Sequence, residues 1–90
     1  MTITPTVHLN GTSRRSLVAN YRAALEALSN AKLMLQEAAP HGRDYYPQGD
    51  AAIQTALDQH QGRIAEIDAI MGEIRTIYQS VLEQAFPGNG

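Results

Sequence analysis

The residues best equipped for chemistry in this chain gather in one short segment, residues 40–49, which reads PHGRDYYPQG. Its two prolines and two glycines prevent a regular helix, yet a turn between helices needs none of the other side chains present. A tyrosine ring stacks on a planar base, and an arginine guanidinium binds phosphate through two parallel hydrogen bonds. The main-chain amides before Asp50 would add a helix N-terminus, which attracts anions. The segment therefore predicts capture of a small nucleotide-like anion, and the candidate contacts are Arg43, Tyr45, Tyr46 and, as a lesser one, His41.

The same segment also has a purely structural interpretation. In that interpretation the two tyrosines cover apolar side chains at the end of a helix bundle. Arg43 then pairs with Asp44 or caps helix carbonyls. The sequence alone is compatible with both interpretations. They differ in whether these side chains contact other residues of the protein or a ligand.

No other segment carries a catalytic or metal-binding pattern. The chain has no cysteine, no H-E-x-x-H sequence, no glycine-rich phosphate loop and no nucleophile elbow. His60 has no second histidine three or four residues away, so we expect a core or interface histidine. The acidic residues Glu66, Asp68 and Glu73 fall on outward helical positions and indicate a solvated face. We therefore expect a protein that is not an enzyme and that holds no metal and no cofactor.

A long second helix, over residues 50–85, is expected to position the segment. Core-type residues recur there in alternating steps of four and three, a period that keeps one stripe of a helix facing a partner. Such a helix would be about 50 Å long, too long for a compact globule of this size, so it needs a helical partner. The stripe consists of Ile53, Leu57, His60, Ile64, Ile67, Met71, Ile74, Tyr78, Val81 and Ala85.

The partner is a first helix over residues 13–39, with the same alternation of steps. Thr12 or Ser13 supplies an N-cap for it, and Asp50 is expected to do the same for the second helix. The stripe of the first helix consists of Leu17, Tyr21, Ala24, Leu28, Ala31, Leu35 and Ala38, and it is widened by Val18, Leu25 and Met34. The predicted fold is all-α and a single domain: an extended arm (1–12), an antiparallel two-helix hairpin closed by the loop 40–49, and a tail (86–90).

Self-association follows from apolar side chains that one hairpin cannot cover. Ile70 and Ile77 lie beside the main stripe of the second helix, and Leu82 lies on its other flank. We expect a dimeric four-helix bundle or a higher closed oligomer. Arg14 and Arg15, at the start of the first helix, would meet the loop only across an antiparallel subunit interface, and they are lesser ligand candidates.

Composition narrows the class of protein further. The 90 residues carry a net charge of −2, with five basic and three acidic side chains in residues 1–49 and two basic and six acidic in residues 50–90. Duplex DNA binding is not expected, because that function shows a basic stripe. The sequence has no signal-peptide pattern and no apolar run of the length a membrane span requires. We expect a cytoplasmic protein without a membrane partner.

Two segments carry a resemblance: L-N-G-T-S at residues 9–13 and G-R-D-Y-Y-P-Q-G at residues 42–49. With them the chain resembles a family of small phage and prophage proteins over most of its length. In size, hairpin and expected oligomerisation it is more distantly similar to helical-hairpin viral sponge proteins, which sequester the nucleotide messengers of anti-phage defence. The resemblance implies a viral accessory role in the host-cell cytoplasm and no reaction. The alternative is a protein-interaction module, either a small phage structural component or an inhibitor that docks on a host protein through the Ile70/Ile77 ridge or the arm.

Overall fold

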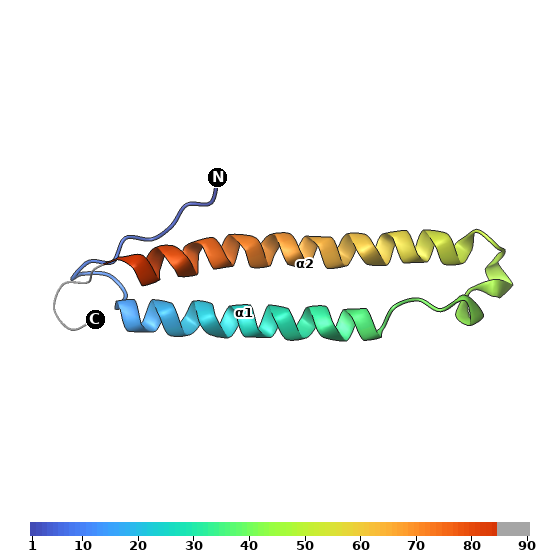
Figure 1. Ribbon diagram of the computed structural model, residues 1–90, viewed down its shortest axis with the longest axis horizontal. Coiled ribbons are helices and arrows are strands. Elements are labelled where there is room, and N and C mark those ends of the chain that lie inside the picture. Colours follow the sequence, from blue (N-terminus) through green and yellow to red (C-terminus); the bar gives the residue numbers. More distant parts are fainter. Residues whose placement is uncertain (85–90) are drawn as a thin grey trace.

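Two long antiparallel helices form a rod in the computed structural model, which describes residues 1–84 (Figure 1). Helix α1 spans Arg14–Glu37 and helix α2 spans Ala52–Glu83, with two short 3₁₀ turns, η1 (Gly42–Asp44) and η2 (Tyr46–Gln48), between them. The molecule measures 63 × 23 × 17 Å. The described residues contain no strand, so the predicted all-α hairpin is confirmed.

Helix α1 begins one residue after the predicted start at residue 13, and it ends two residues before the predicted end. Ser13 is its N-cap, and the side-chain oxygen accepts a hydrogen bond from the backbone N–H of Ser16. The helix ends at Glu37 rather than at the predicted residue 39. Pro40 explains the difference, because proline disfavours helical geometry in the residue before it.

Helix α2 begins two residues later than predicted, and Asp50 is not its N-cap. The cap position belongs to Ala51, and no side chain caps the helix. A turn that starts at Gly49 replaces the side-chain cap, because the backbone N–H of Ala52 donates to the carbonyl of Gly49 at 3.2 Å. Gly49 has a φ of 106°, a left-handed conformation that favours glycine. At the other end α2 stops at Glu83; Ala85 and the predicted tail lie outside the described residues.

The predicted stripe of α2 faces α1, but few side chains are fully enclosed. Among the described residues only Val81, with none of its surface exposed, and His60, at 7 %, count as buried. The other described stripe positions of α2 are half-buried, as are the larger members of the α1 stripe. Ala31 and Ala38 are exposed, contrary to the prediction; Ala38 is already the C-cap, where the helix ends. The hairpin therefore has no enclosed interior; its helices meet along a narrow line of contact between the two apolar stripes, here called the seam.

Polar contacts fix the register of the two helices along this seam. His60 is a core histidine as predicted, with its Nε2 donating to the carbonyl of Leu35 at 2.6 Å. The guanidinium of Arg22 donates to the Tyr78 hydroxyl, a bond that raises the pKa of Arg22 above its ordinary value. Two further polar contacts join the helices: an ion pair of 2.7 Å between Lys32 and Asp68, and a hydrogen bond of 2.8 Å from Arg14 to the carbonyl of Leu82.

Two glycines inside α2 allow a stability test of the exposed helix face. A Cβ added at Gly62 or at Gly72 would meet no atom within 4 Å, so neither glycine is required by packing within the chain. We expect Gly62→Ala and Gly72→Ala each to raise the free energy of unfolding by about 1 kcal/mol, because alanine restricts the unfolded chain more and favours helix. Urea unfolding followed by circular dichroism measures this.

Gly42→Ala is the control, since that position is equally open but lies outside the α-helices. It should change stability less than either helical variant. A loss of stability at Gly62 or Gly72 would contradict this view and would indicate a second chain packed against that glycine.

Candidate functional site

The loop between the helices is an ordered structure. Its two 3₁₀ turns are closed by backbone hydrogen bonds from Asp44 to His41, from Tyr45 to Gly42 and from Gln48 to Tyr45, at 2.9–3.0 Å. The N–H of Gly49 donates to the carbonyl of Tyr46 at 3.2 Å and completes the second turn. These four backbone hydrogen bonds fix the path of the loop without the side chains of Arg43, Tyr45 and Tyr46.

His41 has a structural task in this loop. Its Nδ1 accepts a hydrogen bond of 3.1 Å from the backbone N–H of Arg43, which makes it the N-cap of η1. The ring is exposed, and a ligand would meet its other nitrogen. As a ligand contact His41 is therefore weaker than its residue type suggests.

Arg43 and Tyr46 have no such task. Arg43 is exposed, and within residues 1–84 its guanidinium forms neither the predicted pair with Asp44 nor a bond to a helix carbonyl. Tyr46 has 76 % of its surface exposed, so it covers little of the bundle end. Within one chain, these two side chains do not form the contacts that the structural interpretation expects.

Tyr45 differs from its neighbour. It is half-buried and forms one wall of a shallow, open depression against the first turns of α2. The other residues that line the depression are Gln48, Ala51, Ala52, Thr55, Ala56 and Gln59. Tyr45 therefore covers part of the bundle end, as the structural interpretation expects, and neither Arg43 nor Tyr46 lines this depression.

The structure brings four of the six predicted ligand contacts to one end of the rod and leaves two at the other. Arg14 and Arg15 are the first two residues of α1, whose start lies far from the loop of the same chain (Figure 1). Arg14 donates to the carbonyl of Leu82 near the end of α2, whereas Arg15 is exposed. Of the three predicted arginine contacts, one chain thus places only Arg43 in the loop that carries the tyrosines.

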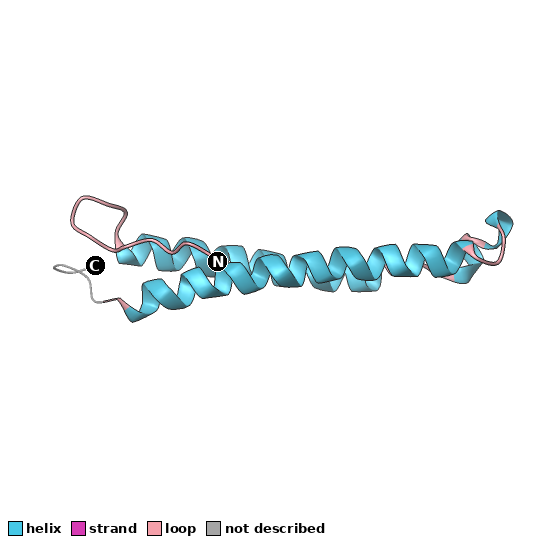
Figure 2. Cartoon of the chain, turned by 90° about the horizontal axis from the view of Figure 1, so that it is seen from above, coloured by secondary structure: helices cyan, strands magenta, loops and turns pink. Residues whose placement is uncertain are grey.

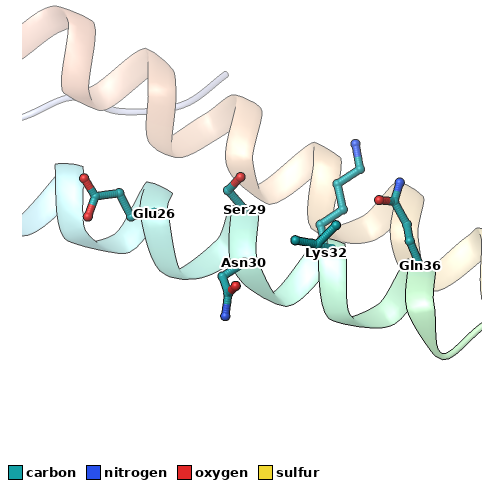
Figure 3. Close-up of a pocket in the computed structure, with 6 residues that line it drawn as sticks. Glu26, Ser29, Asn30, Lys32 and Gln36 are labelled. Atoms are coloured by element: carbon teal, nitrogen blue, oxygen red, sulfur yellow. The ribbon is translucent and has the colours of Figure 1, made fainter.

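Another depression lies on α1, where sequence reasoning predicted no site. Figure 3 shows Ser29, Lys32 and Gln36 extending on the side toward α2, while Asn30 points away from it. Its lining comes from a single helix, and Lys32 is already paired with Asp68. A hollow on one helix face cannot surround a small molecule, so we assign it no ligand.

The apolar residues expected to mediate self-association are only partly covered. Ile70 is 45 % exposed, and Ile77 and Leu82 are half-buried. The structure adds Leu33, at 49 %, and Met34, at 47 %, on α1. Leu33 lies outside the predicted stripe, and its hydrophobic side chain was the only signal available.

Two general findings limit the kinds of site present in residues 1–84. No cluster of three or more histidine, cysteine, aspartate or glutamate side chains is arranged to hold a metal ion. Neither long helix is apolar enough over a sufficient length to cross a membrane.

The two adjacent tyrosines make a matched pair for mutation. We expect Tyr45→Ala to lower the free energy of unfolding by about 1–2 kcal/mol, because it removes a half-buried ring. Tyr46→Ala should change it by less than about 0.5 kcal/mol, because an exposed ring contributes little. Thermal and urea unfolding of both variants measure the difference. An equal loss in both would show that Tyr46 also supports the fold.

Comparison with known proteins identifies no relative. No family model, no curated protein and no solved structure matches the chain.

Proposed function

We propose that this chain is a non-enzymatic, phage-type accessory protein that captures a small nucleotide-like anion at the loop between its helices. The observation that supports the proposal is the state of Arg43 and Tyr46. An ordered backbone displays both side chains to solvent, and neither takes part in the described fold. Side chains held ready without a structural role are what a binding loop requires.

The chemistry of these residues suits a phosphate attached to a planar base. The guanidinium of Arg43 offers paired N–H donors to phosphate oxygens, and the exposed ring of Tyr46 offers a face for stacking. Tyr45 borders the adjoining depression. The resemblance to phage proteins, and the more distant one to viral sponges, is the reason for preferring sequestration of a nucleotide messenger in the host cytoplasm to other uses of an anion site.

A single chain leaves this site open, so the proposal includes self-association. Pockets for small molecules usually bury most of the ligand, whereas the depression beside Tyr45 is shallow and faces solvent. The small number of buried side chains along the seam supports a second copy, because a dimeric four-helix bundle or higher oligomer would cover the half-buried stripe. A neighbouring chain would also provide the missing walls of the site.

The second candidate is a protein-interaction module, favoured by a specific observation. Leu33, Met34 and Ile70 each leave 45–49 % of their surface exposed, on both helices of the rod. In that function a host protein or another phage component covers the apolar residues, and the loop is architectural.

A thermal-shift screen against linear and cyclic nucleotides tests the first candidate. A ligand at a hundred times its dissociation constant should stabilise the wild-type chain by about 2.7 kcal/mol. Arg43→Ala and Tyr46→Ala should each reduce that shift strongly while leaving the melting temperature of the free protein unchanged. Arg63→Ala is the control, because Arg63 is an exposed arginine on α2, away from the loop.

Two results would count against nucleotide capture. One is the absence of a shift across the whole panel with a folded protein. The other is a shift that Arg43→Ala and Arg63→Ala reduce equally, which would indicate a general charge effect. Either result would favour the protein-interaction module.

Light scattering tests the proposed oligomer. Ile70→Asn should lower the measured mass toward that of one chain, because it places a polar amide at the partly exposed apolar position. Ala23→Asn, at an exposed position of α1 outside the stripe, should leave the mass unchanged. A wild-type mass equal to a single chain would contradict self-association.

A further inference from the structure

The N-terminal arm is attached to the hairpin through one side chain near the end of α2. From the start of α1 the arm turns back along the C-terminal turns of α2 (Figure 1). There Oε1 of Gln84 accepts a hydrogen bond of 2.7 Å from the backbone N–H of Val7. Nε2 of the same amide donates to the carbonyl of Pro5 at 2.8 Å. Both bonds join residues 77–79 positions apart in the sequence.

This pair of bonds recognises main chain rather than side chains. A primary amide offers one acceptor and donors side by side, the complement of the N–H and C=O that an extended strand presents. Pro5 and Val7 are half-buried and Thr6 between them is exposed, the alternation expected of an extended segment. The contact is thus a docking site for an extended peptide backbone.

The rest of the arm is poorly matched to its own hairpin. Met1, Ile3 and Leu9 have 120 %, 88 % and 78 % relative exposure, so three large apolar side chains lie in solvent. In one chain the attachment at Gln84 leaves them unused. Packing on a neighbouring hairpin would remove them from water and stabilise the arm.

The connection between arm and helix is a tight turn. The backbone N–H of Gly11 donates to the carbonyl of His8 at 3.2 Å, and a Cβ at Gly11 would lie 2.8 Å from the His8 ring. The turn ends before Ser13, the N-cap of α1. Opening it would redirect the arm without disturbing the helix.

We propose that Gln84 is a docking site for the arm of a second copy of this chain, so that arms are exchanged between subunits in the assembly. A second copy presents the same residues 5–7 and forms the same two bonds, which makes exchange a low-cost route to association. The exposed Met1 and Ile3 of a swapped arm are additional apolar surface that the neighbouring hairpin can cover. The inference concerns assembly and is independent of the ligand at the loop.

Mixed crosslinking of full-length chains tests the exchange, because the natural chain has no cysteine. One chain carries Thr6→Cys, next to both arm contacts, and a second, size-tagged chain carries Glu83→Cys, next to Gln84. After mixing, a flexible bismaleimide should join the two into a heterodimer. Adding Gln84→Ala to the tagged chain should reduce the heterodimer about tenfold, the effect of losing two hydrogen bonds. Gln79→Ala, at an exposed position of the same helix, should leave it unchanged.

Gln84→Glu is a second variant that separates a loss of docking from a loss of folding. Its carboxylate keeps the acceptor for the Val7 N–H and loses the donor to the Pro5 carbonyl, so it removes one of the two bonds. It should give an intermediate yield, and circular dichroism should show the helical content of the wild type. A heterodimer that forms equally with Gln84→Ala would overturn the docking role of Gln84. A third chain carries both Thr6→Cys and Glu83→Cys; a crosslink that forms only within this chain, with no product between chains, would overturn the exchange.

Discussion

The contact between the apolar stripes of α1 and α2 is the constraint on which the rest of this structure depends. It holds the helices antiparallel, which places the loop 40–49 at one end and the arm at the other (Figure 2). The contact is long and narrow, and of the described residues only Val81 and His60 are buried. A rod with so little interior cannot enclose a ligand by itself. Any side chain of the rod that contacts a partner would act at its ends, on its faces or between copies.

The polar contacts along the seam select the alignment of the helices. An exposed ion pair such as Lys32–Asp68 contributes about 0.2–1 kcal/mol, so it adds little to stability. The bond from His60 to Leu35 is different, because His60 is buried and a donor left without a partner there would be costly. Arg14 bonded to the carbonyl of Leu82 fixes the opposite end. Sliding one helix by a turn would break both end contacts together.

Periodicity predicted the helices because their packing follows a rule that repeats along the chain. The alternation of steps located both stripes, and Ser13 was recognisable as a cap by residue type. Asp50 was misassigned because a backbone bond from Ala52 to Gly49 replaces the expected side-chain cap. The bonds of Gln84 to the arm could not be predicted, since they join residues almost eighty positions apart and follow no period. For the loop, the sequence indicated candidate contacts, and only the structure separated half-buried Tyr45 from exposed Tyr46.

The geometry of the two ends also limits how a composite site can form. In an antiparallel assembly the start of α1 in one chain lies near the loop of its neighbour, as the sequence suggested for Arg14 and Arg15. The guanidinium of Arg14 is half-buried and bonded to the carbonyl of Leu82, so recruiting it would open that end of its own hairpin. Arg15 is exposed and can approach a neighbour without that loss. Of the two, Arg15 is therefore the arginine that an intersubunit anion site would use beside Arg43.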